Sequence, residues 1–108
     1  MSSWNIKRGD IIMCDLGMHG GSVQSGIRPC LVVSNDIGNT YSNIYIVVPL
    51  TTKYKKDLPT HVCLAENSYA LCEQCTTVGD QQVLRIKNHI SEKIMEEIDN
   101  ALRVALDL

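Results

Sequence analysis

The chain has 108 residues, of which 44% are apolar and 20% charged, and it carries a net charge of −2. These values predict one domain over residues 1–108 with the composition of an ordinary globular protein. The net charge argues against a broad basic surface for binding nucleic acid. No stretch resembles a membrane span or a secretion signal, so we expect a cytoplasmic protein.

The first third of the chain predicts two strands separated by a flexible loop. Asp10–Leu16 is short and apolar, which is typical of a strand, and the loop Gly17–Gly26 holds four glycines in ten residues. Pro29 suits the first residue of a second strand, where a missing N–H is tolerated, and Cys30–Ser34 continues that strand. Asn35–Asn39 then predicts a turn or a single helical turn.

The middle of the chain predicts further short strands. In Ile44–Leu50 both alternating sets of side chains are apolar, which predicts a strand covered on both faces, either central in the sheet or at an interface. Lys53–Leu58 is a charged connection, and Thr60–Leu64 and Leu71–Val78 are interpreted as strands. Gly79 and Asp80 suit the start of a short helical turn through Gln81–Arg85.

The last eighteen residues predict an amphipathic helix. Ser91 is a natural N-cap, Glu92 suits the first turn, and Ile90 and Met95 stand at the positions of a hydrophobic staple. A 3.6-residue period places one apolar stripe along the helix, formed by Ile94, Ile98, Leu102 and Ala105 or Leu106. Short strands followed by one helix predict a small antiparallel barrel of the β-heavy α+β class.

The cysteines predict free thiols. The chain has an odd number of cysteines, namely Cys14, Cys30, Cys63, Cys72 and Cys75. Four of the five lie in apolar, strand-like surroundings. This pattern favours buried thiols in a reducing compartment over disulfides. Cys72 and Cys75 form a CxxC pair, but no second pair is present to complete a zinc site, so no metal is expected.

One cation and two hydroxyls border the two most apolar strands. Arg28 stands at the start of one predicted strand, and Thr51 and Thr52 end another. If these strands neighbour each other in a small sheet, the side chains share one mouth of it. That arrangement suits an anionic ligand, with phosphate as the first candidate.

The order of several short motifs resembles the MazF/PemK family of toxins, the endoribonuclease halves of bacterial toxin–antitoxin pairs. They span residues 6 to 106: Arg28-Pro29 before an apolar strand, an Asn-Asp turn, a second apolar strand ending in threonine, Leu58-Pro59-Thr60-His61-Val62, Glu73-Gln74, Thr76-Thr77-Val78 and the closing helix. The resemblance implies an SH3-like barrel, a homodimer and a cognate antitoxin. It also implies sequence-specific cleavage of single-stranded RNA without a metal ion or other cofactor.

The resemblance also implies which residues act. The family's catalytic arginine falls on Arg28 and its catalytic threonine or serine on Thr51, while Gly21–Gly26 borders the RNA site. In metal-free cleavage the RNA's own 2′-hydroxyl attacks the phosphate. Arg28 and Thr51 would then supply hydrogen-bond donors to the charge that builds on the phosphoryl oxygens.

One position departs from the family pattern. Many members have Gly-x-Glu-Gln in the loop, whereas this chain has Gly21-Ser22-Val23-Gln24, so Val23 replaces a carboxylate suited to proton transfer. Glu73 is the natural substitute, and His19 and His61 are weaker candidates. The alternatives to a role in proton transfer are a solvent-facing Glu73, a solvated His19 and a structural His61.

The predicted RNA-binding residues lie in the two loops and beside Glu73: Ser22, Gln24, Thr52, Lys53, Lys55, Lys56 and Gln74. Because residues 91–108 hold five acidic and only two basic residues, any RNA-facing surface must be a local patch. Two other functions stay open at this point. One is a gyrase poison on the same barrel, as in the CcdB toxins, although those depend on a tryptophan near the C-terminus and the tryptophan here is Trp4. The other is a catalytically inactive binding module.

Overall fold

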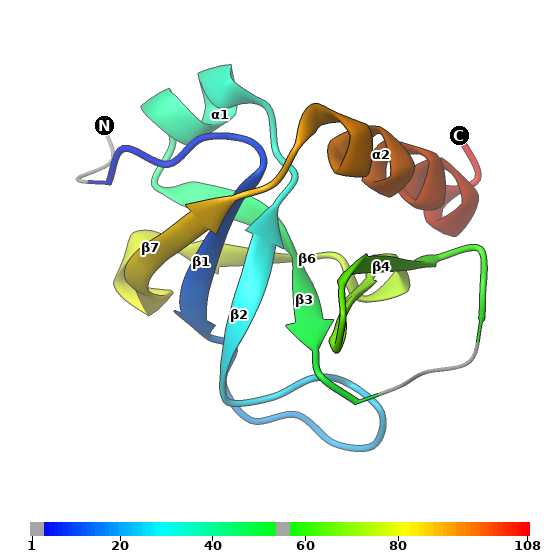
Figure 1. The fold of residues 1–108 in the computed structure, drawn as a ribbon. Helices are drawn as coiled ribbons and strands as arrows, with labels where there is room; N and C mark the ends of the chain where they lie inside the picture. Colours follow the sequence, from blue (N-terminus) through cyan, green and yellow to red (C-terminus); the bar gives the residue numbers. More distant parts are fainter. Residues whose placement is uncertain (1–3, 54–56) are drawn as a thin grey trace.

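The computed structural model describes residues 4–53 and 57–108, in which seven strands form one antiparallel sheet with a long helix across it (Figure 1). The strands are β1 (Asp10–Asp15), β2 (Ile27–Val32), β3 (Ile44–Thr51), β4 (His61–Ala65), β5 (Ser68–Leu71), β6 (Thr76–Gly79) and β7 (Val83–His89). The helices are α1 (Asp36–Tyr41) and α2 (Glu92–Leu106), and single 3-10 turns span Cys72–Gln74 and Asp80–Gln82.

The strands run in the hydrogen-bonded order β4-β5-β3-β2-β1-β7, with β6 also paired to β3. The sheet curves into a barrel-like shape, and in the described residues its two end strands, β4 and β7, are not paired with each other. The predicted fold class, a small β-heavy antiparallel barrel closed by a C-terminal helix, is confirmed in this open form. Neither helix in the described part of the chain has the length and apolar character needed to cross a membrane.

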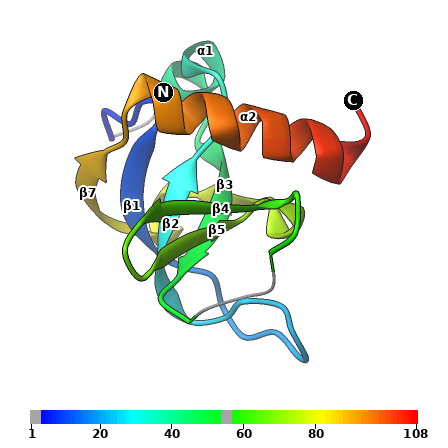
Figure 2. The same cartoon turned by 45° about the vertical axis from the view of Figure 1, so that its right-hand side comes forward.

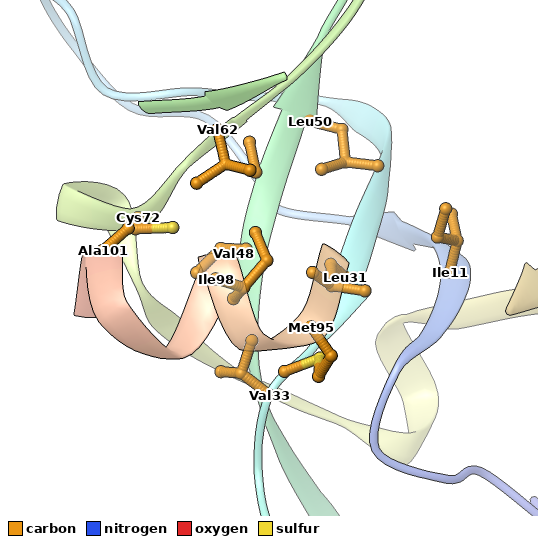
Figure 3. Close-up of a cluster of buried hydrophobic side chains, with 11 residues drawn as sticks. Ile11, Leu31, Val33, Val48, Leu50, Val62, Cys72, Met95, Ile98 and Ala101 are labelled. Carbon is orange, nitrogen blue, oxygen red and sulfur yellow. The ribbon is translucent and has the colours of Figure 1, made fainter. Parts of the chain in front are cut away.

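Two apolar clusters fill the two sides of the sheet. The first lies between the sheet and α2, where Met95, Ile98 and Ala101 pack against Leu31 and Val48 (Figure 3). The second lies on the other side and is built from Ile6, Ile12, Cys14, Leu16, Cys30, Val32, Tyr45, Val47, Val78 and Val83. Because side chains alternate along a strand, each central strand contributes to both clusters.

Strand β3 changes neighbours halfway along its length. Its first half, Ile44–Val47, pairs with β6, and its end, Leu50 and Thr51, pairs with β5. Pro49 lies at the gap between these two partners, where its missing N–H removes no ladder hydrogen bond. Within this chain β3 is covered on both faces except at its start, where Ile44 and Ile46 are 52% and 41% exposed.

Helix α2 begins as predicted but packs through a shifted stripe. Ser91 is the N-cap, and its side chain accepts a hydrogen bond from the Ile94 N–H at 3.2 Å. The most buried positions of the helix are Met95, Ile98 and Ala101, whereas the predicted Ile94 and Leu102 are only half-buried and Leu106 is exposed. Figure 2 shows α2 running across the β4–β5 hairpin.

Two predicted elements after residue 70 are wrong. Leu71–Val78 is not one strand, because the 3-10 turn Cys72–Gln74 carries the chain from the β5 side of β3 to its β6 side. The predicted helical turn Gln81–Arg85 is also wrong in its second half, because Val83 already begins β7. Strand β7 is an edge strand in which only Val83 is buried, so its sequence shows no apolar alternation.

Candidate active site

The candidate site lies where β2 begins and β3 ends. The β2–β3 ladder ends at the pair Cys30 and Pro49, and Arg28 and Thr51 each lie two residues beyond that pair, at the start of β2 and the end of β3. By alternation, Arg28 shares the face of Cys30 and Thr51 the face of Val47, which is the side of the second cluster. The structure therefore brings Arg28 and Thr51 to the same end and the same face of the sheet, as expected from the sequence.

Arg28 is half-buried and held at one nitrogen. Its Nε donates a hydrogen bond to the Ser25 carbonyl oxygen at 2.8 Å. Within residues 4–53 and 57–108 its two terminal nitrogens have no hydrogen-bond or ion-pair partner. The guanidinium is thus oriented by the loop while its terminal N–H donors remain available to an anion.

Thr51 is 5% exposed, and its hydroxyl has one described contact. The Oγ1 atom accepts a hydrogen bond from the Lys53 backbone N–H at 3.2 Å. A hydroxyl that accepts one hydrogen bond keeps its own proton for donation, and the described residues offer Thr51 no acceptor for it. Thr51 therefore has the chemistry of a donor held by a stiff, β-branched side chain.

The loop between β1 and β2 closes over this end of the sheet and is seen at the bottom of Figure 1. At its base the Leu16 N–H donates to the Gly26 carbonyl oxygen at 2.9 Å, and the Gly26 N–H donates to the Gly17 carbonyl oxygen at 2.8 Å. Gly17 and Gly26 have φ values of 79° and 78°, a backbone conformation that favours glycine. Val23, which replaces the family's carboxylate, is 53% exposed.

A cavity of about 270 Å³ lies between this loop and the sheet. Its walls come from the loop, from β3 and from the β6 region: Leu16, His19, Val23, Gln24, Pro49, Gln74, Thr76, Thr77, Val78 and Gln82. Pro49 is two residues from Thr51 on the same face of β3, so the cavity lies beside the Arg28–Thr51 pair. The side-chain oxygen of Gln24 is buried here, and the residues that the structure describes give it no hydrogen-bond donor.

Glu73 points to a different neighbour. Its Oε2 lies 2.8 Å from Nε2 of His61, whose side chain is only 10% exposed. His61 lines a separate groove against α2 together with Glu97 and Asn100. The hydrogen bonds and ion pairs of the described residues do not connect Glu73 with Arg28 or Thr51.

The predicted RNA-binding residues are distributed over more than one face. Ser22, Gln24 and Gln74 lie at the loop, but both ends of the Gln74 amide are hydrogen-bonded to loop backbone. Thr52 lines a cavity on the α2 side of the sheet, and Lys53 is exposed. Lys55 and Lys56 lie outside the described residues.

His19 is exposed, and its ring is tied back to the chain. Its Nε2 lies 2.8 Å from the Leu16 carbonyl oxygen. The sequence predicts a solvated side chain, and the structure shows an exposed ring that is held at the base of the loop.

The thiols are free, and most are buried. Cys14, Cys30 and Cys72 are buried, Cys75 is half-buried and Cys63 is exposed. Burial raises the pKa of Cys72 to about 12, with the charge of Glu73 adding to the rise, and burial also raises the pKa of Cys75. Thiols that stay protonated at neutral pH are poor nucleophiles and poor metal ligands. In the described residues no group of three or more His, Cys, Asp or Glu side chains could hold a metal ion.

Comparison with known proteins gives consistent matches along nearly the whole chain. Residues 7–106 match the family model described as PemK-like, MazF-like toxin of type II toxin–antitoxin system. The chain is 38% identical to Endoribonuclease EndoA of Bacillus subtilis, covering 95% of this chain and 96% of that protein. It is 35% identical to Endoribonuclease MazF of Staphylococcus saprophyticus, covering 95% and 92%. A solved mycobacterial endoribonuclease in complex with its cognate antitoxin superposes with a TM-score of 0.82 at 27% identity, covering 95% and 96%.

Proposed function

Because this chain belongs to the PemK-like, MazF-like toxin family of type II toxin–antitoxin systems, we propose that it is a toxin endoribonuclease that cleaves single-stranded mRNA at specific sequences. The observation that supports this most directly is the placement of Arg28 and Thr51 at the same end of the β2–β3 ladder, next to Pro49, which lines the cavity under the loop. Two donors on one face of a sheet suit a phosphodiester, whose charge lies on its non-bridging oxygens.

The proposed reaction uses the RNA's own 2′-hydroxyl and no metal ion. The 2′-oxygen loses its proton and forms a bond to the adjacent phosphorus, while the bond from phosphorus to the 5′-oxygen breaks and that oxygen takes up a proton. The products are a 2′,3′-cyclic phosphate and a free 5′-hydroxyl. The terminal nitrogens of Arg28 and the hydroxyl of Thr51 would donate to the phosphoryl oxygens as their charge grows.

The residues that transfer protons in this reaction are predicted from the sequence. Glu73 was expected to act in place of the carboxylate that Val23 replaces, and its described partner is His61. If Glu73 and His61 transfer a proton, they would do so at a position away from the sheet face that carries Arg28 and Thr51. The variant Glu73→Gln tests this role, because it removes the basic group while keeping the shape of the side chain.

Base recognition is proposed for the loops around the cavity. An unstacked nucleotide can be read by its edges, as is common in proteins that bind single-stranded RNA. Among the described residues the buried oxygen of Gln24 has no donor, so a small shift of the loop would let it accept from a base N–H. Ser22, Thr52, Lys53, Lys55, Lys56 and Gln74 complete the set of residues proposed to contact RNA or to shape its site.

The proposed partners follow from family membership. We expect a cognate antitoxin that covers the RNA site, and a homodimer in the cytoplasm. The exposed side chains of Ile44 and Ile46 give one apolar surface that a second protein could cover.

The test is cleavage of a long RNA in the presence of EDTA, with the ends of the fragments mapped. Cyclic phosphate ends from the wild type and a fall of about 10²-fold or more for Arg28→Ala are the expected results. The matched control is Arg85→Ala, which removes an exposed arginine from the edge strand β7. A wild-type rate for Arg28→Ala would remove this residue from the reaction. Intact RNA with inhibited gyrase would instead indicate a gyrase poison, and intact RNA with active gyrase an inactive binding module.

A further inference from the structure

The side-chain amide of Gln74 is hydrogen-bonded at both ends to the backbone of the β1–β2 loop. Its Oε1 accepts from the Gln24 N–H at 2.8 Å, and its Nε2 donates to the Ser22 carbonyl oxygen at 2.9 Å. A carboxamide presents an acceptor and a donor in one plane, as a peptide group does. Gln74 therefore pairs with the loop backbone in the way that a residue of a neighbouring strand would. Gln74 itself is fixed in the 3-10 turn between β5 and β6.

These two hydrogen bonds join the loop to a distant part of the chain. The other described hydrogen bonds of residues 18–25 stay within the loop, join it to Leu16 at its base or join it to Arg28. The Gln74 contacts bridge about fifty positions of sequence, from 22 and 24 to 74. Without them, the described hydrogen bonds of the middle of the loop would all lie within the loop or at its base.

The loop in turn orients Arg28. Ser25 follows Gln24 directly, and its carbonyl oxygen accepts the hydrogen bond from Arg28 Nε at 2.8 Å. An arginine side chain has several rotatable bonds, and a fixed carbonyl at Nε limits the directions in which its terminal nitrogens point. Two hydrogen bonds, joined by the backbone between Gln24 and Ser25, therefore connect Gln74 with the guanidinium of Arg28.

We propose that Gln74 is a positioning residue, which fixes the loop and through Ser25 aims the guanidinium of Arg28 at the phosphate. The proposal rests on the proposed function of Arg28 in RNA cleavage. It also changes the role expected for Gln74 from the sequence, because the amide that was expected to contact RNA is engaged with the loop. Misplacing a catalytic group by about 1 Å can lower a rate by about 10²-fold.

The first test is Gln74→Met, which keeps the length of the side chain and removes both hydrogen bonds. We expect kcat for a defined RNA substrate to fall about 10- to 100-fold while KM stays within about threefold. Hydrogen exchange at the Gln24 amide should accelerate, because that N–H loses its acceptor. The matched control is Gln81→Met, at an exposed glutamine for which the described residues show no side-chain hydrogen bond, and it should leave kcat and the exchange unchanged.

The second test is Gln74→Glu, which covers the case in which the methionine variant folds poorly. A protonated glutamic acid can accept from Gln24 and donate to Ser22, whereas the carboxylate can only accept. An ordinary glutamic acid has a pKa of about 4.3, so the protonated fraction grows as the pH falls toward 5. The ratio of variant kcat to wild-type kcat should therefore rise from pH 8 to pH 5, and the same ratio for Gln81→Glu should stay flat.

The outcomes separate this proposal from the proposed function. If the wild type cleaves RNA but Gln74→Met keeps its kcat within about twofold, Gln74 does not position the site. A lowered kcat with unchanged exchange at Gln24, or a flat pH ratio for Gln74→Glu, would also overturn the proposal. If the wild type does not cleave RNA while Gln74→Met still loosens the loop, the failure lies with the proposed function.

Discussion

At the scale of single residues, the Thr51 hydroxyl gives the sharpest prediction about the site. Thr51→Val keeps the branched shape and removes the donor, so kcat should fall by about 10²-fold with little change in RNA binding. Thr51→Ser keeps the hydroxyl on a less restricted side chain and should lose about tenfold or less. Single-turnover kinetics with a labelled RNA measures both, and a valine variant as fast as the serine variant would show that the hydroxyl has no part in the reaction.

The cysteines give a prediction about the CxxC pair. Because burial and the charge of Glu73 raise the pKa of Cys72 to about 12, its thiol stays protonated and unreactive from neutral pH up to about pH 10. Cys63 is exposed on β4. An aromatic disulfide reagent at pH 8 should modify Cys63 rapidly and Cys72 only when the protein unfolds, and Cys63→Ser should remove the fast phase. Rapid labelling of Cys72 in the native protein, detected by mass spectrometry, would show that this thiol is reactive in the folded state.

The candidate site was predictable from the sequence only as far as local motifs reach. Arg28 and Thr51 adjoin long apolar runs, so a resemblance could place both. The contact between Glu73 and His61 joins two elements twelve residues apart, and the contacts of Gln74 with the loop span about fifty residues. A single sequence carries no signal for such distant pairs, so neither contact is predictable from it.

At the scale of elements, predictability followed the strength of the local signal. Helix α2 was found because Ser91 caps it and its apolar period repeats over fifteen residues. Strand β7 was missed because an edge strand with one buried residue has no apolar alternation. The turn at Cys72–Gln74 was missed because it contains no glycine or proline to mark it, and the change of partner along β3 is a tertiary feature.

The cap of α2 gives the element-scale prediction. Ser91→Ala removes the acceptor of the Ile94 N–H and should lower the free energy of unfolding by about 1 kcal/mol. Ser91→Asp keeps an acceptor and adds a negative charge at the helix N-terminus, so it should be neutral or slightly stabilising at pH 7. Urea denaturation followed by circular dichroism measures both. Equal stabilities for the alanine and aspartate variants would show that the cap contributes nothing.

At the scale of the whole molecule, the acidic helix α2 and the Arg28–Thr51 pair lie on opposite sides of the sheet. Residues 91–108, with five acidic and two basic side chains, form or follow α2, which covers the first cluster. Arg28 and Thr51 lie at the end of the face that carries the second cluster. The acidic helix is thereby kept away from the proposed RNA site, and a chain of net charge −2 can still present a small basic patch to a phosphate backbone.

This arrangement predicts a weak salt dependence of RNA binding. If one chain neutralises about two to four phosphates, the slope of log K against log salt for a single-stranded RNA should be about −1.5 to −3. Fluorescence anisotropy with an RNA that carries a 2′-deoxy group at the cleaved position measures binding without cleavage. Lys53→Ala should make the slope shallower by about 0.7, whereas Lys93→Ala on α2 should not change it. A slope steeper than about −5 would mean that RNA crosses a far larger basic surface than the end of β3 and its neighbouring loop provide.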